Sequence, residues 1–499
     1  MRRFGALLAI LAAGCTTMEP KYVRPDPAVP ASWPAGDPGL AHAEAGLPAL
    51  TYKQVFTDPR LQTLIEQGLA NNRDLQAAAA NIAAAREQYR IQRAQQFPQL
   101  GAAGDVTVSG DRSSGSSSSG SGSGNNSSGV RAQYEAGLNV PSFEVDLFGR
   151  LRSLTHAQLN QYFATEAGAR ATRLALVANI ANAWLDYAAD SSLLRISTET
   201  ASSAAKSVQL TRIRLDGGVA PRTDLDQAEQ IMDAAQADLA REKTQVAQDV
   251  NALQLLVGAP IDQALLPTSI DDAFGTIAPV SPGLDSYVLL RRPDVIQSEY
   301  QLRAANANIG AARAALFPRI TLTGLLGFAS SALLKLFTGG AFGWSAGANA
   351  SYTIFQAGAG HANVRLTEAR QRAAVASYQG TIQTAFRDVS DALARRGTIN
   401  DELAARQRQQ AATADTYLLT EARYRAGIDP FLTVLDAQRS YYSAEQTLVS
   451  IKLTAAQNIV TTYQAIGGDT LLQGTPICQP LPGDTGQPNA VLAKECLPD

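Results

Sequence analysis

Two short stretches, Gly217-Gly218-Val219-Ala220-Pro221 and Gly427-Ile428-Asp429-Pro430, decide how this chain folds. Each follows a run of 67 residues, 150–216 and 360–426, that has few glycines and no proline. A glycine that ends one helix, followed by a turn and a proline that opens the next, is typical of a helical hairpin. At 1.5 Å per residue, each run predicts a helix of about 100 Å.

The same signals occur twice along the chain. Three marker residues keep their mutual spacing: Gly218, Pro221 and Gly258 recur as Gly427, Pro430 and Gly467. A period of about 210 residues is too long for a solenoid and indicates duplication of a whole module. We therefore expect a first repeat over 60–270 and a second over 271–470.

Each repeat has the same predicted order of elements. A helix that stops before a proline comes first, then two strands, a long helix and a returning helix. The predicted helices before the strands are 74–97 and 294–317, and residues 60–97 have helical spacing throughout. The strands are predicted at about 100–109 and 131–148, and again at about 319–328 and 344–356. The returning helices are predicted at 221–257 and 430–466.

The predicted strands are amphipathic, with apolar and polar residues alternating. The alternation changes phase at Pro141-Ser142, where proline indicates a bulge or a strand end. An apolar face of this kind fits the core of a sandwich or the lipid side of an outer-membrane barrel. The Ser/Gly-rich tract 110–130 suits a solvated loop at a barrel mouth, which favours the barrel. No run of 18 apolar residues follows the N-terminal leader, so we expect no transmembrane helix.

Four strands cannot close a barrel, because open edges in lipid leave backbone groups without hydrogen bonds. Three chains would supply 12 strands and enclose a lumen, whereas two would supply eight and a filled interior. The alternative, if the strands are set aside, is a soluble helical bundle or coiled-coil lipoprotein.

The N-terminus predicts an export signal over 1–14. Arg2 and Arg3 precede a short apolar run, and small residues lead up to Cys15. This pattern resembles a bacterial lipobox, in which the cysteine is lipidated and becomes the new N-terminus. A cleavable signal with a chance cysteine is the alternative. Residues 15–59 then form an extended, lipid-anchored segment.

Composition narrows the classes of function. The net charge of −3 without long charge runs gives no sign of a nucleic-acid surface. The three histidines lie apart from the cysteines, and the sequence has no nucleophile, phosphate-loop or metal-ligand motif, so we predict no enzyme, cofactor or metal. Cys478 and Cys496 lie in the tail 471–499, which we expect to be periplasmic. They form a disulfide or remain two free thiols.

The duplicated order resembles the TolC-like outer membrane factors, most closely the OprM/NodT type of efflux lipoprotein. The resemblance covers roughly 15–470. It rests on that order, on the strand-to-helix junctions Leu147-Phe148-Gly149-Arg150 and Ile354-Phe355-Gln356-Ala357-Gly358, and on the stretch from Arg423-Tyr424-Arg425-Ala426-Gly427 to Leu435-Asp436-Ala437-Gln438-Arg439. It implies an α+β membrane protein: a homotrimer with a 12-stranded outer-membrane barrel continued by a long periplasmic helical barrel.

The same resemblance implies partners and a gate. The partners are a periplasmic adaptor, an inner-membrane pump of RND type and outer-membrane lipid, and the hairpin turns quoted first would contact the adaptor. Leu432 and Asp436 match positions that form apolar and acidic rings closing the tunnel, with Arg439 able to pair with the acid. Tyr424 and Asp224 match a hydrogen-bonded pair that links the hairpins when closed. Spacing alone favours a solvated surface pair for Asp436 and Arg439.

We therefore predict a lipid-anchored exit duct in the outer membrane, which passively conducts substrates from the pump and adaptor to the outside. The alternatives are a type I protein secretion duct and a structural helical-bundle lipoprotein.

Overall fold

The computed structural model describes residues 17–30, 33, 51–110, 130–278, 286–338 and 340–468. The expected signal peptide 1–14, Cys15 and the tail cysteines Cys478 and Cys496 lie outside these ranges. The described residues form two compact units. The sheet unit contains Ala83–Ala164, Glu299–Ser377 and the described residues up to Pro25, and the hairpin unit contains Asp26–Ile82, Thr165–Ser298 and the described residues from Tyr378 onward.

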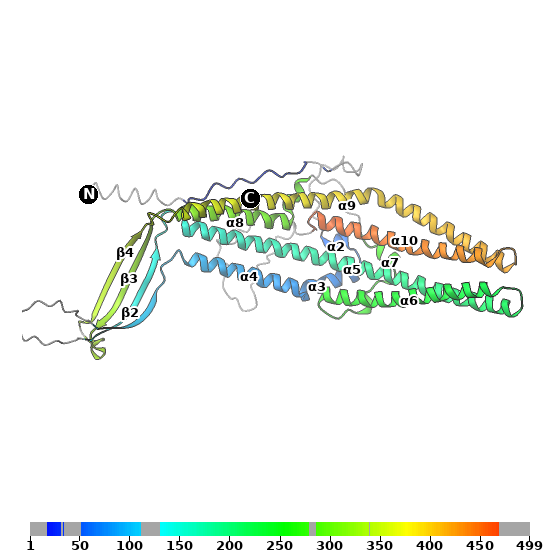
Figure 1. Cartoon of the computed structure of the whole chain (residues 1–499), viewed down its shortest axis with the longest axis horizontal. Coiled ribbons are helices and arrows are strands. Elements are labelled where there is room, and N and C mark those ends of the chain that lie inside the picture. The colour runs from blue at the N-terminus through cyan, green and yellow to red at the C-terminus, as the bar shows by residue number, and fades with distance from the viewer. Residues whose placement is uncertain are drawn as a thin grey trace, which may run out of the picture. The chain divides into compact units, whose positions relative to one another are not determined.

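The elements follow the order expected from the sequence in both repeats (Figure 1). The first repeat contains α2 (Tyr52–Val55), α3 (Pro59–Asn71), α4 (Arg73–Ala94), β1 (Gly101–Gly110), β2 (Val130–Glu144), α5 (Arg150–Asp216), α6 (Arg222–Val257), a 3-10 helix (Gln263–Leu265) and α7 (Ile270–Phe274). The second contains a 3-10 helix (Ser286–Arg291), α8 (Pro293–Ala314), β3 (Arg319–Ser330), a 3-10 helix (Leu333–Lys335), β4 (Phe342–Ser351), α9 (Ala359–Arg425) and α10 (Phe431–Ala465). The helices α5 and α9 are 67 residues long each.

The sheet unit holds one antiparallel sheet in the order β1-β2-β3-β4. The register places Leu138 opposite both Ala102 and Leu326, and Leu326 opposite Trp344. Most apolar side chains of the four strands therefore lie on one face, while Asp105, Glu135, Asn139 and Ser345 lie on the other together with Leu325. On the apolar face, Leu138, Leu322, Leu326, Phe342 and Trp344 are solvent-exposed in the single chain, while Phe143 and Phe328 are half-buried. Among the described residues, β1 and β4 each have one edge without a partner strand.

A bulge interrupts the β2–β3 pairing at the predicted proline. Val140 pairs with Gly324 and Phe143 with Leu322, so β2 carries one residue more than β3 at this point. Because Pro141 has no N–H to donate, the ladder loses a hydrogen bond there and a bulge is tolerated. The extra residue returns Phe143 to the apolar face, as the change of phase in the sequence predicted.

Alanines dominate the helix packing of the sheet unit. The buried positions of α8 include Ala304, Ala307, Ala311 and Ala314, which let neighbouring helices approach closely. Phe148 and Phe317, at the two strand–helix junctions, stack at 4.6 Å between ring centroids. The junction of each repeat is thereby tied to that of the other.

In the hairpin unit, the core forms around Trp184, Tyr463 and Phe56, whose side chains are fully buried. The Trp184 indole N–H donates to the carbonyl of Leu265 at 3.1 Å. The guanidinium of Arg60 bridges Asp58 and Asp272 at 2.7 and 3.0 Å. These contacts join α5 to the Gln263–Leu265 helix and α3 to α7. The Arg60 guanidinium also lies 5.7 Å from the Trp184 ring centroid, and Ile270 N–H of α7 donates to Ser192 Oγ of α5 at 2.8 Å.

The expected continuous helical stretch over 60–97 is broken at Asn72. This residue has an extended backbone (ψ 131°), and its side chain donates to Leu256 O at 2.9 Å and accepts from Leu75 N at 3.0 Å. Asn72 thus ends α3, caps α4 and fastens both to the end of α6. The partner is distant in sequence, so helical spacing alone gave no sign of the break. Among the helices of the described ranges, none combines the length and apolar character needed to cross a membrane.

Candidate functional site

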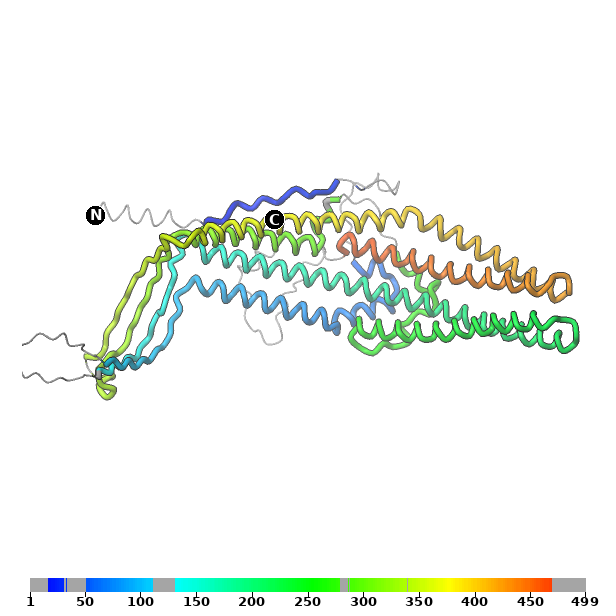
Figure 2. The backbone as a smooth tube through the Cα atoms, viewed as in Figure 1, coloured from blue at the N-terminus to red at the C-terminus, as the bar shows by residue number. Residues whose placement is uncertain are grey.

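The candidate site lies in the hairpin unit, where α5 reverses into α6 and α9 into α10 (Figure 2). In the first turn, Val219 N–H donates to Arg214 O and Gly218 N–H to Leu215 O, both at 2.9 Å. These two bonds make a Schellman motif, and Gly218 takes the left-handed conformation (φ 71°) that the motif requires. Pro221 is the N-cap of α6, one residue before the position expected from the sequence.

The second turn has the same geometry. Ile428 N–H donates to Arg423 O and Gly427 N–H to Tyr424 O, both at 2.9 Å, and Gly427 has φ 76°. An ion pair is added, because the guanidinium of Arg423 donates to both carboxylate oxygens of Asp429 at 2.7 and 2.9 Å. The hydrogen bonds from Arg423 lower the pKa of Asp429. This pair fixes the second turn, and the sequence did not reveal it.

Both turns present apolar side chains to solvent. Val219 is 69% exposed and Ile428 is 62% exposed, at corresponding positions after the glycine of each motif. The remaining turn residues Gly217 and Asp429 shape the turn, and Ala220 and Pro430 lead into the returning helices.

An apolar cluster joins the two hairpins just behind the turns. It consists of Val208 of α5, Ala228 of α6, Tyr424 of α9 and Phe431, Val434 and Leu435 of α10, with Leu225, Ile231, Met232 and Tyr417 packed against them. The hairpins are therefore held together mainly by buried apolar area. Tyrosine hydroxyls add polar links, since Tyr442 Oη donates to Asp238 at 3.2 Å and lies 3.1 Å from Ser197 Oγ.

Tyr424 does not make the expected hydrogen bond to Asp224. Its ring is 5% exposed, and its hydroxyl is buried with no hydrogen-bond partner among the described residues. The guanidinium of Arg214 lies over the ring at 4.6 Å instead, and Phe431 packs at 5.2 Å. Asp224 is half-buried in the first turn of α6. The hydrogen bond is absent within this single chain, because ring packing and the cation hold Tyr424 within the cluster, and the link in a closed assembly stays a prediction.

The other candidate gate residues lie on the exposed face of α10. Leu432 is 53% exposed, and the Asp436 and Arg439 side chains are 66% and 54% exposed. Their charged groups are 3.9 Å apart, so within one chain the pair contributes only about 0–1 kcal/mol. Phe431, Val434 and Leu435, on the buried side of α10, enter the cluster. Leu432 and Asp436 therefore lie outside the apolar cluster of the chain, where another molecule can contact them.

Sequence reasoning missed several residues that this structure brings to the hairpins. Arg214, Tyr417 and Tyr442 link the hairpins, and the spacing of seven between Tyr417 and Tyr424 was the one available sign, since it places both on one face of α9. This spacing indicates that one face of α9 packs against another element, but it does not identify that element.

A cluster of acidic side chains lies farther along the hairpin unit. Burial and the neighbouring Asp249 carboxylate raise the pKa of Asp190 to about 7. Burial, followed by the charge of Asp249, raises the pKa of Asp186, which accepts a hydrogen bond from Gln457 at 2.8 Å. Within the described ranges, no group of three or more Asp, Glu, His and Cys residues is arranged to hold a metal.

Comparisons with known proteins agree with this architecture. The family model described as outer membrane efflux protein matches residues 64–259 and 285–468. The chain is 42% identical over 470 residues to the probable efflux pump outer membrane protein TtgC of Pseudomonas putida, covering 93% of this chain and 94% of the relative. It is 35% identical over 458 residues to the probable outer membrane lipoprotein SilC of Salmonella typhimurium, covering 91% and 96%.

A solved structure gives the same result for the fold. The open state of the MtrE outer membrane channel of Neisseria gonorrhoeae superimposes with a TM-score of 0.80 at 34% identity. The match covers 91% of this chain and 98% of that channel. The neighbour is an outer membrane channel, and the match spans both compact units.

Proposed function

Because the chain belongs to the outer membrane efflux protein family, we propose that it is the outer-membrane exit duct of an efflux system, a member of the OprM/TolC type. The relatives are transport proteins, and no catalytic activity is indicated. In the structure, the observation that carries this function is the four-stranded sheet, which presents one continuous apolar face and two unpaired edges. A surface of this kind fits a bilayer and cannot be complete in one chain.

The assembled duct is a homotrimer with a 12-stranded barrel. β1 of one chain pairs with β4 of the next, which removes the open edges and places the apolar face toward lipid. The long helices α5 and α9, with the shorter helices that accompany them, form the periplasmic wall. The unpaired edges and the exposed Leu138 and Trp344 support this arrangement.

Mass measurement and single-channel recording of the purified full chain test the assembly together. We expect the mass of three chains and a measurable conductance in planar bilayers. A monomer that still conducts would refute the proposed architecture, and a trimer that never conducts would refute the duct.

The duct receives substrates from a periplasmic adaptor and an inner-membrane pump of RND type. The two hairpin turns are the adaptor-contacting surface, supported by the exposed Val219 and Ile428. Changing both residues to Ser, with the exposed Leu366 of the sheet unit changed to Ser as control, should weaken adaptor pull-down only in the turn variant. Equal binding by all three proteins would exclude the turns as the contact.

The periplasmic end is closed by Leu432 and Asp436 from three chains. Both side chains are exposed on one face of α10, outside the apolar cluster, and Arg439 lies near enough to screen the acid. Asp436→Asn should lower the preference for cations in bilayer recordings, because three negative charges leave the constriction. Asp415→Asn, an exposed change on α9, serves as control, and equal selectivity in both variants would place the gate elsewhere.

Cys15 carries a covalent lipid that anchors the chain to the outer membrane. The small residues before Cys15 and the relative named as a lipoprotein support this modification. Fatty-acid labelling of cells should mark the parent protein and leave Cys15→Ala unmarked. An unlabelled parent would contradict the proposal.

A further inference from the structure

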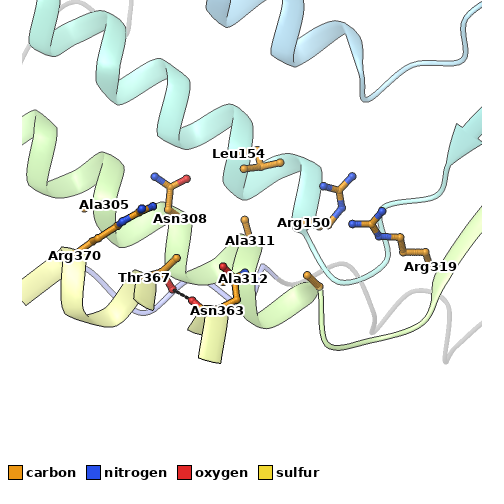
Figure 3. A pocket seen from close by; sticks show the side chains of 11 residues that line it. Arg150, Leu154, Ala305, Asn308, Ala311, Ala312, Arg319, Asn363, Thr367 and Arg370 are labelled. Atoms are coloured by element: carbon orange, nitrogen blue, oxygen red, sulfur yellow. Dashed lines mark hydrogen bonds between the residues drawn. The ribbon is translucent and has the colours of Figure 1, made fainter. Parts of the chain in front are cut away.

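A pocket of about 440 Å³ opens in the sheet unit where the helices meet the strands (Figure 3). Its walls come from α5, α8, α9 and the first residue of β3. Its lining includes Arg150, Leu154, Asn308, Arg319, Asn363 and Arg370. Alanines of α8 form much of the remaining surface, so the pocket has an apolar floor beside charged and amide groups.

The pocket carries uncompensated positive charge. None of its lining residues is acidic. Arg150 is neutralised by Glu144, with two hydrogen bonds of 2.7 Å each. Arg319 and Arg370 are exposed and make no ion pair within 4 Å with the described residues, and Arg319 interacts with Glu144 only at longer range. Figure 3 shows Arg319 beside Arg150 at one end of the pocket and Arg370 at the other.

The N-terminal segment shows which way the pocket faces. On α8, Asn306 donates to Pro20 O at 2.8 Å, and Glu299 pairs with Arg24 at 2.8 Å. Asn306 and Glu299 are seven positions apart and share one face of the helix. The lining positions of α8, such as Asn308 and Ala312, lie on the opposite face.

In the proposed trimer, the N-terminal segment and the pocket lie on opposite faces of α8, which decides where the pocket opens. The N-terminal segment leads to a lipid-bearing Cys15, so it must run on the outer surface, from which the acyl chains reach the bilayer. The pocket, on the other face of the same helix, then opens into the lumen. Three chains would place three such pockets around the duct.

We propose that this pocket is a luminal binding site for amphiphilic organic anions, an inference that rests on the proposed duct. The carboxylate or sulfonate group binds at one end of the pocket, to Arg319 or to Arg370, and the apolar body lies over Leu154 and the alanines. Guanidinium groups match such anions through paired N–H donors. Because the arginines are solvent-exposed, each contact is weak, and weak binding lets an anion leave again along the duct.

The test compares two double variants of the purified full chain with the same loss of charge. Arg319→Gln/Arg370→Gln empties the pocket of its free cations. Arg365→Gln/Arg372→Gln is the matched control, because both residues are exposed on the face of α9 opposite Arg370. Naphthalene-2-sulfonate is the anionic probe and 2-naphthylmethanol the uncharged one. Calorimetry measures binding, and bilayer recording measures the ratio of anion to cation permeability.

We expect the pocket variant to bind naphthalene-2-sulfonate about tenfold more weakly than the parent, since the charged contact is lost at either end of the pocket. The control variant should bind naphthalene-2-sulfonate as tightly as the parent does. None of the three proteins should bind 2-naphthylmethanol more tightly than naphthalene-2-sulfonate. Anion permeability should fall only in the pocket variant. Equal loss in both variants, or no binding by the parent, would overturn the proposal. Binding is measured without current, so a non-conducting protein would refute the duct without deciding the pocket, and unchanged binding in a conducting pocket variant would refute the pocket alone.

Discussion

Replacing Asp190 with asparagine should stabilise the protein at alkaline pH and leave its stability unchanged in acid. Asp190 of α5 lies near Asp249 and Glu242 of α6 and Asp186 of its own helix, and burial with the Asp249 carboxylate raises the pKa of Asp190 from 3.8 to about 7. The unfolded carboxyl loses its proton near its ordinary pKa, so the folded state holds more protons between the two values. Stability therefore falls as the pH rises from about 4 to about 7, and the loss is complete above that range.

The size of the effect follows from the shift. A change of about three pKa units corresponds to about 4 kcal/mol as a ceiling, at 1.36 kcal/mol per unit. Asp190 is only half-buried, and solvent screens the neighbouring charges, so we expect about 2 kcal/mol per chain. Asparagine removes the charge and keeps the shape, so the variant should gain that amount where the parent carboxyl is ionised.

Thermal unfolding of the detergent-purified protein, followed by the loss of helical circular dichroism, measures this difference at about pH 4 and about pH 8. Asp233→Asn, an exposed change on α6, is the control and should shift neither midpoint. If Asp190→Asn gained no more stability at the higher pH than at the lower, the reasoning about the acidic cluster would be refuted.

Three further changes probe other parts of the chain. Tyr424→Phe should be neutral or stabilise by about 1 kcal/mol in thermal unfolding, because it removes a buried hydroxyl without a partner; a clear loss would reveal a hydrogen bond formed in the assembly. Gly258→Ala should destabilise by about 1–3 kcal/mol, since Gly258 has φ 72° and the new Cβ would lie 2.7 Å from Asn71 O; an unchanged midpoint would count against strain at the end of α6. Leu138→Lys should cost about 2–4 kcal/mol near the middle of the bilayer, measured by trimer yield, whereas Gln133→Lys on the polar face should cost little. Equal yields would argue that lipid does not cover the face of Leu138.

The helices, strands and turns could be predicted because their signals are local. Gly218 and Gly427 take left-handed conformations that glycine favours, and Pro141 marks a bulge because proline cannot donate to the ladder. The break at Asn72 could not be predicted from helical spacing, because it depends on the carbonyl of Leu256, which arrives from the end of α6.

The candidate site was predicted less completely, because part of it depends on contacts between residues distant in sequence. The turns and the exposed face of α10 follow from spacing along single helices, and the structure presents Leu432 and Asp436 to solvent. The environment of Tyr424 depends on which groups of α5 come to face α9, and one sequence does not specify that register. The approach of Asp190 to Asp249 likewise depends on how α5 and α6 pair across their hairpin.

The β2–β3 pairing has a consequence for the order in which the protein can be built. This pairing joins a strand of the first repeat to a strand of the second, and the sheet unit takes Ala83–Ala164 from one repeat and Glu299–Ser377 from the other. While the chain is being delivered from its N-terminus, β1 and β2 are therefore present for some time as a hairpin whose inner edge has no neighbour. Such an edge readily pairs with foreign strands, so the nascent protein needs protection until β3 arrives. Neither half of this duplicated chain can then complete its sheet as a separate polypeptide.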